Sequence, residues 1–246
     1  TVATFEFIAA EGEWAYGNDE MRDCLPAQPH FRAYLREQVS PGATRATLIK
    51  LACLLHDVAK PQTKTLTESG RARFLGHTKE GAHVSGEILR RLRFSQQECT
   101  FVQTLVYNHL RPAQMSGEGL PSTRAVYRFF RDTKDAGFGV LYLALADYLA
   151  CRGPLYTMTE WSNVCKLARY VIDEHARQKE AVHPPRLITG NDIMMLLNIG
   201  PSPTVGRILA RVLEAQASGE INSREEALTL ARKTYNREVK TVRTAK

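Results

Sequence analysis

The chain has 246 residues, of which 43% are hydrophobic and 24% are charged. A chain of this size can bury one sizeable core and a smaller appendage. It contains no apolar run of about 18 residues and no secretory signal, which argues against a membrane protein and favours a cytoplasmic one. The formal net charge of +7 is compatible with an anionic partner.

Helical periodicity runs through most of the chain, and no sustained alternating pattern occurs. The sequence therefore predicts an all-α fold. Ser122 and Thr123 can cap one helix, and Ser223 with Glu226 forms a capping-box signature for the last one. The expected helices are Ala46–Leu55, Gly81–Leu92, Gln96–Asn108, Thr123–Arg131, Val140–Cys151, Trp161–Arg177, Thr204–Ala217 and Ser223–Thr234.

A histidine and an aspartate, His56 and Asp57, stand side by side at the end of an apolar run. An apolar helix would carry this pair inward, where polar groups without partners are costly. Imidazole nitrogen and carboxylate oxygen together suit a divalent metal ion such as Zn, Mn, Fe or Ni. The alternative is a core histidine hydrogen-bonded to a carboxylate, which is the commoner explanation of an isolated His-Asp pair.

Three further metal-competent side chains, His77, His109 and Asp147, lie beside or within apolar segments. The order His-Asp, His, His, Asp resembles the HD superfamily of metal-dependent phosphohydrolases. The stretch from His56 through Gly76-His77 to Gly81-Ala82 looks like the HD region of the bacterial poly(A) polymerase and CCA-adding tRNA nucleotidyltransferase family. The run 187–228 resembles the RNA-binding C-terminal part of the same enzymes.

The resemblance implies a two-metal centre. In it, His56, Asp57 and Asp147 would hold one ion, His77 and His109 would hold a second, and Asp57 could bridge the two. The cofactor would be a divalent ion, with Mg, Mn, Ni, Zn and Fe as candidates. Such ions lower the pKa of bound water and so supply a hydroxide nucleophile for phosphoester cleavage.

Lys60 and Arg111 are the other catalytic candidates beside Asp57. Both could reach the transferred phosphoryl oxygens. For Lys60 an equally good alternative is a lysine at a helix C-terminus that meets the macrodipole, with Pro61 ending the helix. Asn108 stands where many two-metal HD proteins carry another histidine, which leaves a site with one ion, or with none, as an alternative.

Basic residues dominate the C-terminal end of the chain. They form either a solvated tail or a surface that follows RNA phosphates, and the family resemblance favours tRNA or other RNA as the partner. Arginines at helical spacing give a weaker hint of a second basic surface at Arg124, Arg128 and Arg131. The candidate RNA-binding residues are Arg232, Lys233, Arg237, Lys240 and Arg243.

The expected organisation is an HD-superfamily helical domain at 1–155, a connecting helix and linker at 156–186, and a smaller helical C-terminal domain at 187–246. The family's N-terminal nucleotidyltransferase segment does not occur in this sequence. The stretch Thr1–Phe7 resembles the helix that follows the first ligand histidine of HD proteins, so we expect a fragment cut at that histidine. Two functions remain open: an HD-type phosphohydrolase or phosphodiesterase acting on nucleotides or RNA ends, or a non-catalytic tRNA-binding body and tail with a structural or degenerate HD site.

Overall fold

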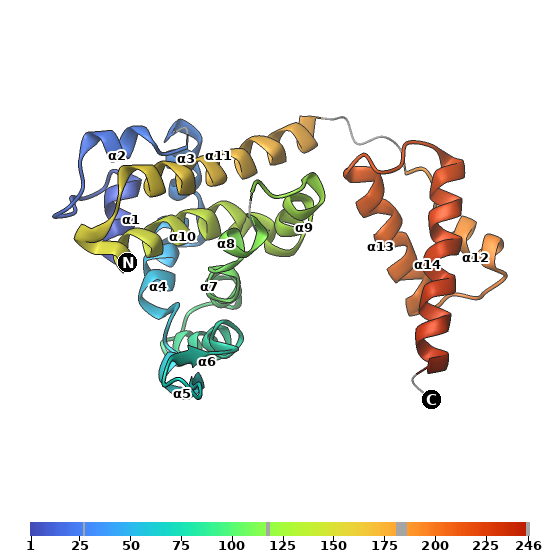
Figure 1. The fold of residues 1–246 in the computed structure, drawn as a ribbon, viewed down its shortest axis with the longest axis horizontal. Coiled ribbons are helices and arrows are strands. Elements are labelled where there is room, and N and C mark those ends of the chain that lie inside the picture. Colours follow the sequence, from blue (N-terminus) through green and yellow to red (C-terminus); the bar gives the residue numbers. More distant parts are fainter. Residues whose placement is uncertain (27, 117–118, 181–185, 245–246) are drawn as a thin grey trace. The chain divides into compact units, whose positions relative to one another are not determined.

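The structure is a computed structural model that describes residues 1–26, 28–116, 119–180 and 186–244 (Figure 1). It is mainly helical, which confirms the predicted all-α class. None of the described helices has both the length and the apolar character needed to cross a bilayer. The elements are α1 (Val2–Ala9), α2 (Asp19–Asp23), α3 (Gln28–Arg36), β1 (Gln38–Ser40), β2 (Ala43–Thr44), α4 (Arg45–Leu55), α5 (Lys60–Thr63), β3 (Lys64–Leu66), β4 (Ala72–Phe74), α6 (His77–Arg91), α7 (Gln96–Asn108), α8 (Arg111–Ser116), α9 (Thr123–Thr133), η1 (Lys134–Ala136), α10 (Gly137–Arg152), η2 (Gly153–Leu155), α11 (Met158–Glu180), α12 (Gly190–Leu197), α13 (Pro203–Ala217) and α14 (Arg224–Thr244).

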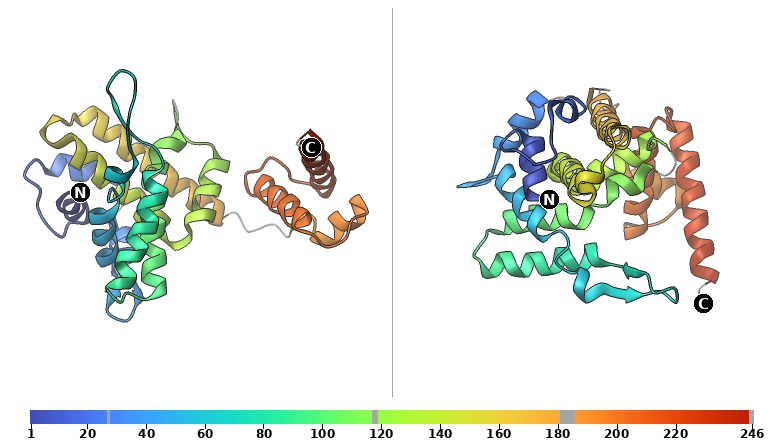
Figure 2. Two further views of the ribbon diagram at one scale, coloured as in Figure 1. Left: turned by 90° about the horizontal axis from the view of Figure 1, so that it is seen from below. Right: turned by 60° about the vertical axis from the view of Figure 1, so that its left-hand side comes forward.

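Two short antiparallel hairpins, β1–β2 and β3–β4, interrupt the helices. The sequence pattern does not predict either of them, because strands of two or three residues are too short to show an alternating period. Both views of Figure 2 show the β3–β4 hairpin projecting beyond the helices next to it.

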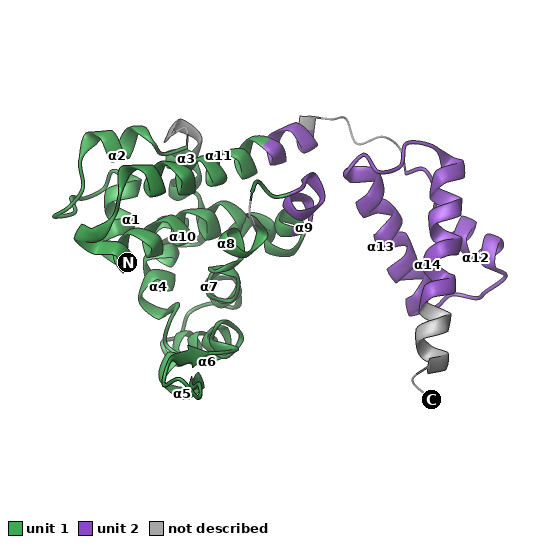
Figure 3. Cartoon of the chain, in the orientation of Figure 1, with its two compact units in different colours: residues 1–121, 129–173 green, residues 122–128, 174–246 purple. Residues whose placement is uncertain are grey.

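The described chain forms two compact units (Figure 3). The first comprises residues 1–121 and 129–173, and the second comprises 122–128 and 174–246. Along the sequence, the division therefore falls within α9 and α11. The domain limits expected from the sequence differ from these units and stay a prediction.

Helix α10 is at the centre of the first unit. Its sequence is apolar on nearly every side, and such a helix is stable only when other elements surround it. Helices α1, α4, α7 and α8 all pack against it. Val140 and Leu143 are fully buried, and the hydroxyl of Thr4 donates a hydrogen bond to the carbonyl of Ala146 at 2.7 Å. The packing and this hydrogen bond fix α10 as a rigid support for Asp147.

The chain reverses direction between α4 and α6. Helix α4 ends at Leu55, and the short α5 and the β3–β4 hairpin follow before α6 begins. Gly76 caps α6 in the left-handed region, with φ of +79°, a conformation that costs glycine little. Because of this turn, α6 starts at His77, four residues before the predicted Gly81. Helix α6 then packs along α7.

In the second unit, α12, α13 and α14 enclose a small core of their own. Ile193, Ile208 and Ala227 are fully buried there. Thr189 and Asp192 form a reciprocal capping box at the start of α12, which satisfies backbone donors that the first helical turn leaves free. This unit therefore has both a hydrophobic core and a well-formed helix terminus.

Candidate metal centre

Four segments of the first unit bring the five predicted metal ligands together. His56 is the C-cap of α4 and Asp57 follows it, while His77 opens α6. His109 is the C-cap of α7, and Asp147 lies in α10. All three histidines are buried. The side chains thus share one location, and their assignment as metal ligands stays a prediction.

Each histidine is oriented by its own backbone. The Nδ1 atoms of His56, His77 and His109 lie 2.9, 2.7 and 2.7 Å from the carbonyl oxygen three residues earlier. Since a carbonyl can only accept, Nδ1 carries the hydrogen and Nε2 offers its lone pair when the ring is neutral. This fixed tautomer is the one that metal-binding histidines commonly have. The accepting carbonyls belong to Cys53, Phe74 and Val106.

Asp57, His77 and His109 form the tightest group, with one ligand atom from each lying within 4.8 Å of the others. Oδ1 of Asp57 is 3.7 Å from Nε2 of His77 and 4.0 Å from Nε2 of His109. These distances exceed hydrogen-bond lengths. Burial, as the main cause, lowers the pKa of His109 and keeps that ring neutral.

The group fits a divalent ion. Oδ1 of Asp57 and Nε2 of His77 are buried, and neither has a hydrogen-bond partner among the described residues. Buried polar atoms without partners are costly, and an ion bound between these two would satisfy both. Two imidazoles and one carboxylate are a donor set that suits Zn, Fe, Mn or Ni.

His56 and Asp147 differ from these three residues, because their side chains are hydrogen-bonded to each other. Nε2 of His56 lies 3.1 Å from Oδ1 of Asp147 and 3.3 Å from Oδ2 of Asp57. Burial opposes the charge on His56, but the hydrogen bonds with the two carboxylates outweigh it and raise the pKa of His56 to about 9. Without metal, this ring is an imidazolium between two carboxylates. Binding an ion through its Nε2 requires the loss of that proton.

Lys60 is directed at the same cluster. Its Nζ lies 2.6 Å from Oδ2 of Asp57. Burial would raise the pKa of Asp57, but hydrogen bonds from His56 and Lys60 hold it well below its usual range. Lys60 is the first residue of α5, with Pro61 next to it, rather than the end of a helix. The alternative reading of Lys60 as a helix C-terminal lysine is therefore wrong.

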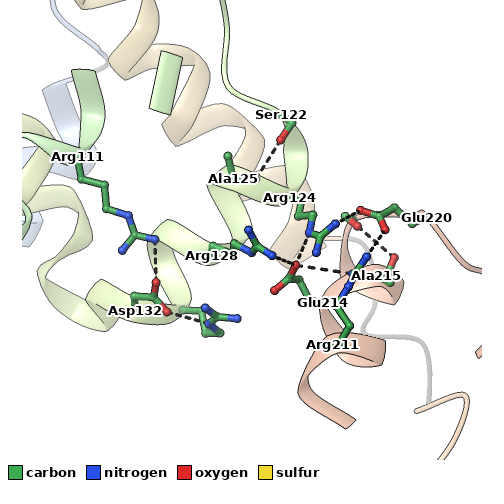
Figure 4. A network of polar contacts seen from close by, with 12 residues as sticks. Arg111, Ser122, Arg124, Ala125, Arg128, Asp132, Arg211, Glu214, Ala215 and Glu220 are labelled. Carbon is green, nitrogen blue, oxygen red and sulfur yellow. Dashed lines mark hydrogen bonds and ion pairs between the residues drawn. The ribbon is translucent and has the colours of Figure 1, made fainter. Parts of the chain in front are cut away.

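Arg111 is held away from Asp57 by other partners. Its guanidinium donates to Asp132 at 2.8 Å, as Figure 4 shows, and to Asn108 at 3.3 Å. The amide of Asn108 donates to the carbonyl of Thr104 in its own helix. The phosphate-binding role of Arg111 stays a prediction, and it requires the side chain to leave Asp132.

Three of the five predicted RNA-binding residues line a pocket in the second unit. Arg232, Lys233 and Arg237 come from α14, and the pocket has a volume of about 740 Å³. The side chains of Lys240 and Arg243 lie outside the described part of the structure. The other lining residues are Leu196, Leu228, Thr229 and Asn236.

The arginines at the start of α9 are engaged by acids within the second unit (Figure 4). Arg124 and Arg128 both contact Glu214, whose side chain is only 5% exposed. Arg211 and Arg124 each reach Glu220 at 3.2 Å. Local sequence gives no signal for these pairs, because the acids lie about ninety residues from α9. Because Arg124 and Arg128 already have these carboxylate partners, the prediction that α9 carries a basic surface for phosphate is weakened.

Comparisons with known proteins agree with this geometry. Residues 33–151 match the HD domain family, and this range includes all five predicted metal ligands. The CC-adding tRNA nucleotidyltransferase of Thermus thermophilus is 38% identical over 180 residues, which are 72% of this chain and 38% of that protein. The A-adding enzyme of Deinococcus radiodurans is 32% identical over 182 residues, covering 73% of this chain and 40% of that protein.

A third relative extends the match. The CC-adding enzyme of Geobacter sulfurreducens is 26% identical over 205 residues, or 82% of this chain and 38% of that protein. The chain therefore spans about two fifths of the length of these relatives. It carries an HD domain followed by further helices, and it is a partial homologue of the CC- and A-adding tRNA nucleotidyltransferases.

Proposed function

We propose that the HD region is a metal-dependent phosphohydrolase or phosphodiesterase acting on nucleotides or RNA ends. One observation carries the proposal: Asp57, His77 and His109 converge within 4.8 Å, while two of their buried atoms lack hydrogen-bond partners among the described residues. A purely structural helix bundle gains nothing from such a cluster, because unpaired buried polar atoms are destabilising. The HD domain match supports the same chemistry.

The ion, when bound, would supply Lewis acidity and a water molecule of lowered pKa. The protein's side chains hold the ion and neutralise the charge of the phosphoryl group. Asp57, His77 and His109 form the holding group, and the neutral tautomers of the two rings present Nε2. Lys60 places a cation 2.6 Å from Asp57, where it can also neutralise a phosphoryl oxygen. The two-metal prediction adds an ion held by His56, Asp57 and Asp147.

Hydrolysis of bis(4-nitrophenyl) phosphate by the purified chain tests this proposal. Activity should require added Mn²⁺ or Zn²⁺, disappear with chelator, and fall at least a hundredfold in Asp57→Ala and in His77→Ala. His83→Ala is the matched control, because His83 lies on the same helix as His77 with its side chain 62% exposed and paired with Glu87. Activity that survives in His77→Ala, or metal-loaded protein without activity, would contradict the proposal.

A second function, RNA binding, is supported by the pocket on α14. It is lined by two arginines, a lysine and two leucines, so the site combines cations for phosphate with apolar surface for bases. We infer that this pocket binds tRNA or other RNA. The names of the relatives point to tRNA as the RNA.

Salt titration of tRNA binding tests the second function. The triple substitution R232Q/K233Q/R237Q should weaken binding and lower the log-log salt slope by about 2, since each phosphate contact to single-stranded RNA contributes about 0.7. R90Q/R91Q/K166Q removes the same charge from exposed positions on α6 and α11 and should leave the slope unchanged. Equal salt slopes for the two triple variants would mean that the basic residues of α14 form a solvated tail and do not contact RNA.

A further inference from the structure

The β3–β4 hairpin is a basic, exposed arm beside the metal centre. It carries Lys64, Arg71 and Arg73 against a single acid, Glu68. All the strand residues except Phe74 are exposed, and Phe74 is half-buried. Nothing in the hairpin contributes to the buried core of the first unit. Its projection and charge therefore need a reason other than folding.

The strand register gives the hairpin one mixed face. Lys64 pairs with Phe74 and Leu66 pairs with Ala72, so these four side chains share one face, while Thr65 and Arg73 share the other. Leu66 is 67% exposed. The first face thus combines an aromatic ring and an exposed leucine with a lysine.

This face leads directly into the candidate metal centre. The carbonyl of Phe74 accepts the hydrogen bond that orients His77, at 2.7 Å. Nζ of Lys60 lies 5.6 Å from the centre of the Phe74 ring and 2.6 Å from Oδ2 of Asp57. The ammonium of Lys60 therefore lies between the ring of Phe74 and the carboxylate of Asp57, where a phosphoester would react. Leu66 is two strand positions farther out, about 7 Å at the usual rise per residue.

We propose that the hairpin is the binding arm for a single-stranded RNA segment whose terminal phosphoester lies at Asp57. The proposal rests on the phosphoesterase function above and names its substrate class. Bases stack on Phe74 and lie against Leu66, and Lys64 neutralises a phosphate on the same face. Arg73, on the opposite face, and Arg71 near the turn add to the positive field that attracts the RNA. Leu66 lies two strand positions beyond Phe74, so the arm offers an oligonucleotide end contacts outside the metal centre that a free nucleotide does not need.

The test compares hairpin variants in the full chain. The substrates are a pentaribonucleotide with a 3′-phosphate and bis(4-nitrophenyl) phosphate. In K64Q/R71Q/R73Q, KM for the RNA should rise at least fivefold, and the log-log salt slope of KM should fall. The ratio of kcat/KM for RNA to kcat/KM for the small diester should fall in parallel. Phe74→Leu should raise KM for the RNA about fivefold through lost stacking.

R90Q/R91Q/K166Q serves as the charge-matched control and should keep the wild-type ratio. Wild-type KM and salt slope in the hairpin triple would overturn the proposal. So would competition by polyglutamate as effective as that by RNA of equal charge, because the arm would then be a docking site for an acidic protein.

A separate readout keeps the arm and the proposed activity distinguishable. The same RNA carrying 4-thiouridine near its 3′ end, irradiated with the full chain in the presence of chelator, should crosslink to residues 64–75. This crosslink does not need hydrolysis. If neither substrate is hydrolysed but the crosslink forms, the phosphoesterase proposal is wrong, while the proposal that the hairpin binds RNA is supported. Crosslinks confined to α14 would overturn the arm.

Discussion

Nε2 of His77 lies 3.7 Å from Oδ1 of Asp57, and neither atom has a hydrogen-bond partner among the described residues. A structural His–Asp pair would close to hydrogen-bond distance. Two ligands of one zinc ion stay apart, because tetrahedral geometry with bonds of about 2.1 Å separates them by about 3.4 Å. The observed spacing is therefore nearer to that of two ligands than to that of a bonded pair.

Metal should stabilise the protein through this pair. Zn²⁺ at a hundred times its dissociation constant adds about 2.7 kcal/mol to the free energy of unfolding when only the folded state binds it. We expect a clear rise in Tm on adding Zn²⁺ to wild-type chain and to His83→Ala, and no rise in His77→Ala. Differential scanning fluorimetry measures this. A similar rise in all three proteins would place the ion elsewhere.

Gly76 should matter for both stability and metal affinity. Its φ of +79° lies in the left-handed region, where a Cβ costs about 1–2 kcal/mol, and the next residue is His77. Gly76→Ala should therefore lower the free energy of unfolding by about 1 kcal/mol and weaken metal binding. Urea unfolding and metal titration measure the two effects. Gly200→Ala is the control, because Gly200 has open space around its Cβ position and no positive φ. An unchanged affinity in Gly76→Ala would show that the turn does not position His77.

Much of this arrangement follows from local sequence. The helix predicted at Gln96–Asn108 coincides with α7, and the one predicted at Ala46–Leu55 differs from α4 by one residue, because the apolar periodicity extends over these helices. The start of α6 was missed because it depends on the left-handed Gly76 rather than on periodicity. The pairing of Glu214 with arginines of α9 was missed because it joins residues far apart in the chain.

Lys60 and Arg111 should differ in their effect on hydrolysis, although the sequence places both beside a candidate ligand. Lys60 already points at Asp57, whereas Arg111 is bound to Asp132. Lys60→Gln should lower kcat/KM for bis(4-nitrophenyl) phosphate about tenfold, equivalent to about 1.4 kcal/mol in the barrier. Arg111→Gln should lower it less. Steady-state kinetics, with the metal content of each variant measured alongside, test this difference. An equal loss of kcat/KM in both variants would show that Arg111 contacts the phosphate as Lys60 does.

Glu214 should make the second unit sensitive to acid. Burial would raise its pKa, but hydrogen bonds from Arg128 and Arg124 outweigh burial and lower the pKa from the usual 4.5. A carboxyl with a lowered pKa contributes stability that is complete above its unfolded pKa and is lost as pH falls through the folded one. Glu214→Gln should therefore cost about 2 kcal/mol at pH 7, between the values for exposed and for buried pairs.

The same difference should shrink as the pH falls below 4.5, because protonation then removes the charge from the wild-type side chain as well. Urea unfolding at several pH values, followed by a probe in α13 or α14, measures the difference. Glu225→Gln is the control, because Glu225 is an exposed acid on α14, and it should change stability little at any pH. A constant difference between wild type and Glu214→Gln down to pH 3 would mean that the packing of the side chain, and not its charge, stabilises the unit.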